Sequence, residues 1–327
     1  MKLVICQPHR FELWNPPPWI ASRLHEEFPD VHAVLLPQYD HLQEEITDAE
    51  IFVGLSLRPK QFTAARKLRW IHSPAAAVHQ LMMPELVQSN VLLTNAARVH
   101  GPVVAEHAFA LLLGLAKRLP HAMRLQASQS WGQQALWEGF PKPRELAGGT
   151  VCLVGLGSIG SEFALRARSF EMRVMAVREH AELGAGAADE VFSTERLDDV
   201  LPRADYVVIA APLTAATRGL IDERRLALMK KDAYLINVSR GALVDEPALI
   251  KALREKSIGG AALDVFSAEP LPPGSPLWQL ENLLITPHTA ALTERLWERH
   301  YQFLAQNLRR FLSGQELLGV VEKNLGY

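Results

Sequence analysis

The sequence predicts an α/β protein with two parallel sheets, each covered by helices. Short apolar runs alternate with longer amphipathic segments, which is the pattern of strands joined by crossover helices. The runs form two series within 327 residues, a length that accommodates two domains. The expected strands are 3–6, 51–54, 70–72 and 91–94 in the first series, and 151–154, 173–177, 206–210, 234–238, 261–265 and 283–286 in the second.

A long helical pattern, residues 102–125, separates the two series. Pro102 stands at its expected first position, where proline is favoured. The segment 129–144 that follows is rich in Trp, Gln and Pro and has no clear period. We expect it to form an excursion or a partner-binding loop.

An amphipathic stretch, residues 293–312, follows the last expected strand. We expect it to pack back on the first domain, which would make that domain discontinuous. The predicted boundaries are therefore residues 1–100 plus 291–327 for the first domain and residues 101–290 for the second.

Composition and charge exclude several classes of protein. The 34 Lys and Arg and the 36 Asp and Glu leave a net charge of -2 without a basic stripe, so neither nucleic acid nor a membrane is an expected partner. The two cysteines, Cys6 and Cys152, lie in apolar runs and are expected in the core, which excludes a disulfide framework. The stretch 103–116 is interrupted by Glu106 and is expected to be too short to span a bilayer. We expect a soluble, cytoplasmic protein.

A glycine-rich loop opens the second series. The sequence Gly155-Leu-Gly157-Ser158-Ile159-Gly160 follows an apolar strand and precedes a helical run. In such a loop, backbone N–H groups and a helix N-terminus approach a pyrophosphate without a Cβ in the way. We therefore predict that this loop binds a dinucleotide; the alternative is a tight turn that is only structural.

The end of the following strand indicates which dinucleotide. A carboxylate there would accept a hydrogen bond from the ribose 2′-hydroxyl of NAD(H), but this chain has Arg178, followed by Glu179. A guanidinium suits a 2′-phosphate. NADP(H) is therefore expected to be favoured over NAD(H). The alternative is a solvated Arg178, with Glu179 binding the ribose.

Three polar residues follow strands downstream of the glycine loop: Arg240, Glu269 and His288. Each alone has a simpler reading, as a turn arginine paired with a surface acid, an exposed loop acid and a hydrogen-bonded loop histidine. Ligands of a doubly wound sheet bind at the carboxyl ends of its strands. The three together therefore predict a catalytic group.

These motifs resemble those of the D-isomer-specific 2-hydroxyacid dehydrogenase family. The resemblance covers nearly the whole chain and includes, besides the residues above, Thr94-Asn95, Val104 to His107, Ala211 to Thr214 with Thr217, Ile236 to Glu246, and Asp264 to Pro270. It implies two Rossmann-like domains, one flavodoxin-like substrate domain and one dinucleotide-binding domain, with a cleft between them. It also implies a homodimer built on the nucleotide domain.

The resemblance also implies residue roles. Arg240 would hold the substrate carboxylate and 2-oxo oxygen, His288 would exchange the proton, and Glu269 would orient His288. Besides the glycine loop and Arg178, the implied cofactor-binding residues are Ala211, Pro212, Thr217, Val238 and Asp264, the last at the nicotinamide carboxamide.

The substrate carboxylate would bind the N–H groups of Ala76 and Ala77, the second of which stands where the family usually has glycine. Arg98 stands where the family often has glycine, and we expect it at the surface rather than directed at an anionic group.

The implied activity is the NAD(P)H-dependent interconversion of a small 2-oxo acid and a D-2-hydroxy acid, with reduction favoured, as in glyoxylate/hydroxypyruvate reductases. The alternative is a dinucleotide-sensing, corepressor-like binding protein of the same fold. The spacing of His79, His100 and His107 matches no ligand pattern, so no metal is expected.

Overall fold

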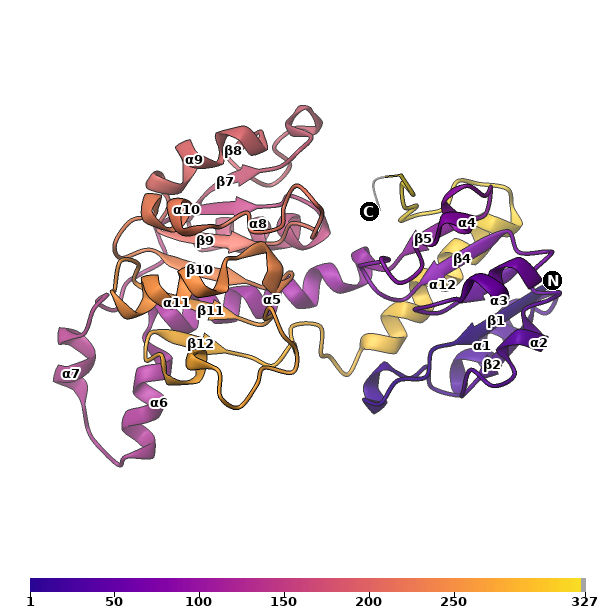
Figure 1. The fold of residues 1–327 in the computed structure, drawn as a ribbon, viewed down its shortest axis with the longest axis horizontal. Coiled ribbons are helices and arrows are strands. Elements are labelled where there is room, and N and C mark those ends of the chain that lie inside the picture. The colour runs from indigo at the N-terminus through magenta and orange to yellow at the C-terminus, as the bar shows by residue number, and fades with distance from the viewer. Residues whose placement is uncertain (325–327) are drawn as a thin grey trace. The chain divides into compact units, whose positions relative to one another are not determined.

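The computed structural model describes residues 1–324 and has two compact units (Figure 1). Unit 1 comprises Met1–His100 together with the C-terminal segment that begins at Thr293, and unit 2 comprises Gly101–Leu292. Each unit holds one parallel sheet, so the predicted fold class is confirmed. Residues 325–327, the end of the predicted first domain, lie outside the described part of the chain.

Unit 1 is built on a five-stranded parallel sheet in the order β2-β1-β3-β4-β5. Side chains of successive strand residues point to opposite faces, so Leu3 and Ile5 face one hydrophobic cluster and Val4 faces another. The strands are β1 (Lys2–Cys6), β2 (His32–Leu36), β3 (Ile51–Val53), β4 (Trp70–Ser73) and β5 (Leu92–Asn95).

Helices cover both faces of this sheet. Leu24 of α1 (Trp19–Glu27) and Leu308 of α12 (Leu296–Leu312) are fully buried in the cluster that contains Leu3. The opposite face is covered by α2 (Leu42–Glu45), α3 (Pro59–Ala64) and α4 (Pro84–Val87), which contribute to the cluster that contains Val4. The C-terminal helix is therefore an integral part of the unit 1 core.

Unit 2 is built on a seven-stranded sheet in the order β12-β11-β10-β9-β6-β7-β8, with every neighbouring pair parallel. Strands β9, β10 and β11 are buried along their whole length, as expected for a parallel sheet with helices on both faces. The strands are β6 (Thr150–Val154), β7 (Arg173–Val177), β8 (Glu190–Phe192), β9 (Tyr206–Ile209), β10 (Tyr234–Asn237), β11 (Gly260–Leu263) and β12 (Leu283–Ile285).

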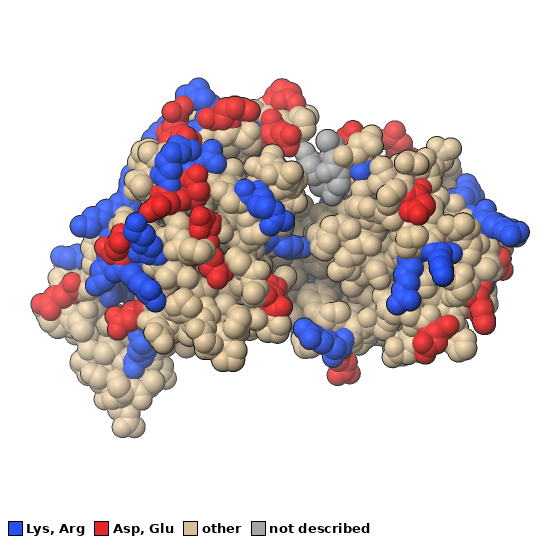
Figure 2. Space-filling view, viewed as in Figure 1, with Lys and Arg blue, Asp and Glu red and all other residues tan. Residues whose placement is uncertain are grey.

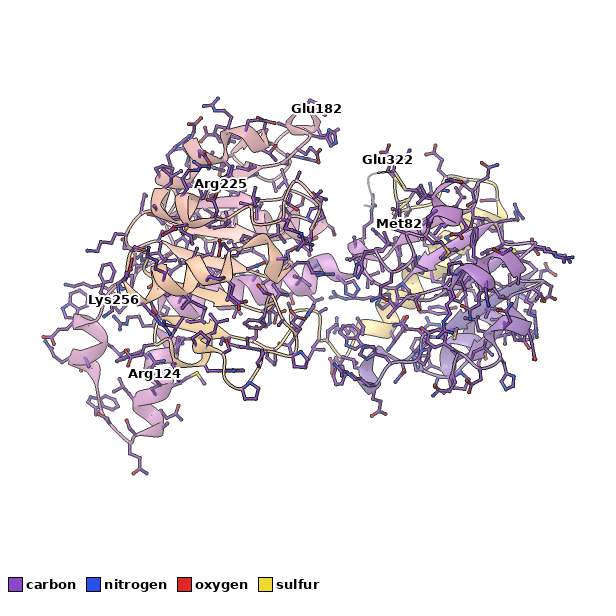
Figure 3. All side chains as sticks on the ribbon, in the orientation of Figure 1. Met82, Arg124, Glu182, Arg225, Lys256 and Glu322 are labelled. Carbon is purple, nitrogen blue, oxygen red and sulfur yellow. The ribbon has the colours of Figure 1, made fainter. Side chains whose placement is uncertain are left out.

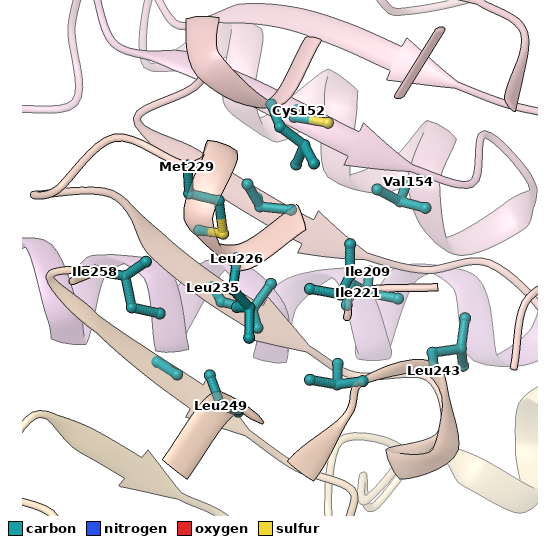
Figure 4. Packing of buried hydrophobic residues seen from close by; sticks show 14 of the residues in the cluster. Cys152, Val154, Ile209, Ile221, Leu226, Met229, Leu235, Leu243, Leu249 and Ile258 are labelled. Carbon is teal, nitrogen blue, oxygen red and sulfur yellow. The ribbon is translucent and has the colours of Figure 1, made fainter. Parts of the chain in front are cut away.

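The two faces of this sheet carry separate hydrophobic clusters. One cluster joins the sheet to α5 (Ala97–Ala116) and α8 (Ser158–Ser169). The other joins it to α9 (Leu197–Val200), α10 (Glu223–Leu228) and α11 (Glu246–Arg254), and Figure 4 shows its members Cys152, Val154, Ile209, Leu226, Leu235 and Leu249. The short 3-10 helices lie in the connections of both units: η1 (Glu12–Trp14), η2 (Ala181–Leu183), η3 (Thr194–Arg196), η4 (Leu201–Arg203), η5 (Gly241–Leu243) and η6 (Pro276–Gln279).

The sequence pattern identified ten strands but missed β2 and β8. Both missed strands lie at a sheet edge. The residues of β8 and most of those of β2 are only partly buried or exposed. An edge strand has one pairing partner and less apolar contact, so its sequence lacks the continuous apolar run by which the central strands were found.

The prediction of one helix over residues 102–125 was wrong. The structure has α5 and, after a break, α6 (Leu119–Ala127), because Arg118 takes a left-handed conformation with φ 56°. The helix α5 begins before Pro102, which lies inside it. At its start the N–H of Ala97, which has no acceptor within the helix, donates to Asn95 Oδ1 at 3.2 Å.

Helix α5 is the one helix in residues 1–324 that is long and apolar enough to cross a bilayer, because it begins at Ala97, before the stretch 103–116. However, 72% of its most apolar window is buried inside the structure. Ala105, Ala108 and Leu112 are each fully buried in the unit 2 core. This burial is that of a core helix.

The predicted excursion at residues 129–144 contains a short helix, α7 (Gln133–Glu138), which the sequence pattern did not show. Helices α6 and α7 project from the rest of unit 2 (Figure 1). The two cysteines are free thiols with no exposed surface, as predicted, and burial raises the pKa of each thiol to about 12.

Candidate active site

The predicted site residues of unit 2 follow strands that end at one edge of its sheet. Strands β10, β11 and β12 are consecutive neighbours, and Arg240, Glu269 and His288 follow them in that order. Because the strands are parallel, their carboxyl ends share an edge, which is where ligands of such sheets bind. The glycine loop follows β6 at the same edge.

The glycine loop needs glycine for steric reasons. Gly155 has φ 98°, and a Cβ there would lie 2.5 Å from the backbone nitrogen of Ala211. A Cβ on Gly160 would lie 2.1 Å from the Gly155 carbonyl oxygen. These two positions therefore hold the loop against the end of β9 and hold α8 against the loop.

Gly157 serves a different purpose, because a Cβ there would meet nothing within 4 Å. It directly precedes α8, whose first residues, Ser158 and Ile159, offer N–H groups that have no acceptor within the helix. The side chain of Ile159 packs against the core. The open backbone and the helix N-terminus fit the pyrophosphate of a dinucleotide.

Arg178 follows β7, and its backbone N–H donates to the Phe192 carbonyl of β8 at 3.0 Å. The loop beyond it holds Glu182, labelled in Figure 3, which accepts from His180 Nδ1 at 3.1 Å. A hydrogen bond from its own backbone, the contact with His180 and the charge of Arg178 hold the pKa of Glu182 below its usual value. The Arg178 guanidinium forms no hydrogen bond or ion pair with any residue in 1–324.

The loop after β9 contains Ala211, Pro212 and Thr217. Thr217 Oγ1 donates to the Pro212 carbonyl at 2.7 Å and accepts from the Thr214 N–H at 2.8 Å. Ala211 is tied to the next strand end, because its carbonyl accepts from Ser239 Oγ, directly after the buried Val238. These bonds fix the predicted cofactor residues of this loop in one conformation.

The turn that carries Arg240 is fixed by two residues that the sequence analysis did not single out. Asn237, fully buried at the end of β10, donates to the Arg240 carbonyl at 2.9 Å and accepts from the Ser239 N–H at 3.0 Å. A Cβ on Gly241 would lie 2.0 Å from the Phe266 carbonyl carbon, so glycine is required there. The signal available in the sequence was an asparagine at the end of an apolar strand, followed by Ser-Arg-Gly.

Arg240 itself is half-buried, and its Nη1 donates to the Ser239 carbonyl at 2.6 Å. Burial lowers the pKa of its guanidinium, and the negative charge of Glu269 opposes that effect. An arginine remains charged even so. The site thus holds a partly desolvated cation, whose attraction for a carboxylate is stronger than that of a solvated one.

Glu269 and His288 form a direct pair, with Glu269 Oε2 2.6 Å from His288 Nδ1. The other carboxylate oxygen accepts from the Phe266 N–H at 2.9 Å, which fixes its orientation. The hydrogen bond to Glu269 raises the pKa of His288, although burial opposes the shift. Burial would raise the pKa of Glu269, but the bonds from His288 and Phe266 outweigh it and the pKa is lowered.

The His288 backbone takes the left-handed conformation, with φ 54°, which is uncommon for a residue with a side chain. Its N–H donates to the Asp264 carbonyl at 2.8 Å. The buried Asp264 carboxylate also accepts from the N–H groups of Thr289 at 2.8 Å and Ala290 at 3.0 Å. Asp264 thus holds the loop that carries His288, and its contact with the nicotinamide stays a prediction.

The residues predicted to bind the substrate carboxylate, Ala76 and Ala77, lie in unit 1, in the loop after β4. Asn95 Nδ2 donates to the Ala76 carbonyl at 3.1 Å and fixes this loop. The N–H groups of Ala76 and Ala77 donate to no acceptor in the described chain. Arg98 is exposed. No three His, Cys, Asp or Glu residues among those described are grouped so that they could hold a metal ion.

Comparison with known proteins identifies the family. The model of the NAD binding domain of D-isomer specific 2-hydroxyacid dehydrogenases matches residues 109–290, which include the glycine loop and all three predicted catalytic residues. The glyoxylate reductase of Thermofilum pendens is 34% identical over 88% of this chain and 86% of its own length. This chain belongs to the D-isomer specific 2-hydroxyacid dehydrogenase family.

Two solved structures of dehydrogenases are similar over nearly the whole chain. The family member from Xanthobacter autotrophicus Py2, in complex with NADPH and MES, is 28% identical with a TM-score of 0.82 and covers 99% of both chains. The D-lactate dehydrogenase of Aquifex aeolicus, complexed with NAD and lactic acid, is 25% identical with a TM-score of 0.72 and covers 95% of this chain and 96% of its own.

As a member of this dehydrogenase family, the protein is an oxidoreductase that binds a nicotinamide dinucleotide and reduces 2-oxo acids to 2-hydroxy acids. The relatives with assigned activities are enzymes, so the alternative of a corepressor-like binding protein is not favoured.

The Glu269–His288 pair gives a pH prediction. If His288 is the proton donor, as the resemblance to the family implies, reduction needs its protonated form, and the rate should fall as pH rises through the raised pKa of this histidine. Glu269→Gln removes the carboxylate charge and should move that fall to lower pH, by on the order of one pH unit. The measurement is kcat/KM for 2-oxo acid reduction against pH. If the fall in kcat/KM at high pH stays at the same pH in Glu269→Gln, Glu269 does not raise the pKa of His288.

Proposed function

We propose that this enzyme reduces a small 2-oxo acid of the glyoxylate type, with Arg240, Glu269 and His288 as its catalytic residues. The proposal rests on the contact of Glu269 Oε2 with His288 Nδ1 at 2.6 Å. These two residues follow β11 and β12, which are the next strands in the sheet after β10, the strand that precedes Arg240. An imidazolium and a guanidinium at one sheet edge suit a substrate that carries a carboxylate and a carbonyl.

Each residue has a defined task in this proposal. The Arg240 guanidinium binds the substrate carboxylate and the 2-oxo oxygen, and so stabilises the negative charge that develops on that oxygen. The dinucleotide, when bound, supplies the hydride. Protonated His288 donates its Nε2 proton to the 2-oxo oxygen, while Glu269 at Nδ1 keeps the imidazolium oriented and charged. In unit 1, the N–H groups of Ala76 and Ala77 bind the substrate carboxylate.

The size of the substrate is the least constrained part of the proposal. The similarity to the T. pendens glyoxylate reductase supports glyoxylate, and hydroxypyruvate offers the same carboxylate and carbonyl with one more carbon. A panel of 2-oxo acids of increasing size, scored by kcat/KM, tests this choice. A preference for large apolar 2-oxo acids would overturn it.

Arg240→Lys tests the catalytic assignment. Lysine keeps the charge but lacks the planar fork that binds two oxygens, so kcat/KM for glyoxylate should fall by about 100-fold or more. Dinucleotide affinity, measured by fluorescence titration, should be retained. Arg254→Lys at the exposed end of α11 is the matched control and should keep full activity. Near-normal turnover of a folded Arg240→Lys protein would remove Arg240 from the mechanism.

We infer that NADPH is preferred over NADH. Arg178 stands after β7, at the position where a carboxylate would favour NAD(H), and its guanidinium forms no hydrogen bond or ion pair within residues 1–324. A charge-assisted contact with the 2′-phosphate contributes about 1.5 to 3 kcal/mol. The NADPH complex of the Xanthobacter relative is consistent with this preference, whereas the NAD complex of the Aquifex relative is a case of the opposite choice.

Arg178→Asp tests the cofactor preference. The wild type should use NADPH with a kcat/KM roughly 10 to 100 times that with NADH, from the strength of one charge-assisted contact. The substitution should move the preference toward NADH and leave the ranking of 2-oxo acids unchanged. Arg168→Asp makes the same change of charge in the last turn of α8, at the opposite end of this helix from the glycine loop, and should leave the preference intact. Equal use of both cofactors by the wild type would contradict the inference.

We also propose a homodimer formed through unit 2 and a cytoplasmic location. The arm made of residues 119–140 carries Leu119, Met123, Trp131, Trp137 and Phe140 with exposed fractions between 47% and 93%. Its only charged residues are Arg124, labelled in Figure 3, and Glu138, and most of its surface is uncharged in Figure 2. An exposed apolar arm of this kind suits burial against a second copy.

The free thiols of the two cysteines suit a reducing compartment, which supports the proposed cytoplasmic location.

The dimer proposal predicts the effect of charges placed on the arm. Replacing both Trp131 and Trp137 with Glu should convert a dimer to a monomer, because a buried interface does not accommodate unpaired carboxylates. Trp278→Glu, at a half-exposed position elsewhere in unit 2, should leave the dimer intact. Light scattering after size-exclusion chromatography measures the mass. A monomeric wild type would rule the proposal out.

A further inference from the structure

His107 contacts the loop that carries the proposed proton donor, although it lies 181 positions before His288 in the sequence. It stands on α5, and its Nε2 lies 2.9 Å from Thr286 Oγ1. Thr286 follows β12 directly and is two residues before His288. The sequence analysis included His107 in a motif of the family resemblance and weighed it as a metal ligand, but gave its side chain no role.

The direction of the hydrogen bonds follows from the groups involved. Thr286 Oγ1 lies 2.6 Å from Asp264 Oδ1, and that oxygen also accepts from the Thr289 N–H. The carboxylate oxygen accepts, so the single hydroxyl proton of Thr286 is given to Asp264. The hydroxyl oxygen is then left as an acceptor, and His107 Nε2–H donates to it. The chain of donors therefore runs from His107 through Thr286 to Asp264.

Asp264 is the point at which this chain reaches His288. Its carbonyl accepts from the His288 N–H at 2.8 Å, and its carboxylate accepts from the backbone of the two residues that follow His288. These bonds hold His288 in its left-handed conformation, from which Nδ1 reaches Glu269 at 2.6 Å. A change in the orientation of the Thr286 hydroxyl would loosen the same loop.

We propose that His107 is a positioning residue for the proton donor, acting through Thr286 and Asp264 to keep His288 against Glu269. The inference rests on the proposed function of His288. It assigns a task to a side chain that is 23% exposed and does not need to touch substrate or cofactor. The charged groups that face the two histidines are Asp264, 3.5 Å from His107 Nε2, and Glu269, Asp264 and Arg240 around His288.

Two substitutions at His107 distinguish the effect of the hydrogen bond that it donates from the effect of the volume of its ring. His107→Leu removes the donor, and kcat for 2-oxo acid reduction should fall about 10-fold with unchanged KM values, the usual size of an effect on a supporting contact. His107→Gln places an amide donor within reach of Thr286 and should restore most of the activity. Thr286→Val removes both the acceptor for His107 and the hydrogen bond to Asp264, so adding His107→Leu to it should cause no further loss.

The decisive readout is the titration of His288 followed by NMR of the histidine side chains, because it does not depend on turnover. His107→Leu and Thr286→Val should lower the pKa of His288, as Glu269→Gln is expected to do. His107→Gln should leave that pKa unchanged. Dinucleotide affinity should be the same in all variants.

Three results separate the possibilities. A lower melting temperature with unchanged kcat and unchanged His288 titration would reduce His107 to a structural residue and overturn the proposal. Weaker dinucleotide binding with unchanged His288 titration would also overturn it. A shifted His288 titration in a protein that reduces no 2-oxo acid would support the positioning role and refute the proposed function instead.

Discussion

Parallel pairing of β10, β11 and β12 is the constraint on which the active site depends. Each strand leaves the sheet at the same edge, so residues far apart in the chain follow adjacent strands. Glu269 and His288 are 19 positions apart and still form a direct hydrogen bond. The sheet is held between two hydrophobic clusters, one on each face, and this packing makes the edge rigid.

The buried carboxylate of Asp264 is the second element of this arrangement. A carboxylate without exposed surface would be costly to bury, but its oxygens accept two backbone N–H groups and a threonine hydroxyl. Those bonds fix the loop after β12 in a conformation that includes a left-handed histidine. The strain of that backbone is thereby offset by hydrogen bonds that point inward, and the imidazole remains half-exposed.

Glycines contribute to the site through the space they leave. Gly155, Gly160 and Gly241 each permit a backbone approach that a Cβ would prevent. Two of them bring the dinucleotide loop against its neighbours, and the third brings the Arg240 turn against the loop that contains Glu269. Gly157 is different, because the space beside it is open, as a loop that admits a pyrophosphate requires.

The sequence by itself determined the fold class, the central strands and the positions of the candidate catalytic residues. Continuous apolar runs mark buried parallel strands, and polar residues directly after such runs must lie at a sheet edge. The spacing of the glycines was likewise sufficient to predict the glycine loop, because the steric need for glycine in such a loop is a local property of the sequence.

Only the tertiary structure decided the contacts that join distant segments. The edge strands β2 and β8 were not predicted, because they pack on fewer neighbours and lack a continuous apolar run. The helix break at Arg118 was not predicted either, because hydrophobic periodicity does not show that this residue takes a left-handed conformation. The hydrogen bond from His107 to Thr286 and the one from Asn237 to the Arg240 turn are side-chain contacts set by the final packing. Local propensity and periodicity carry no information about such partners, because the partner lies on another element of the fold.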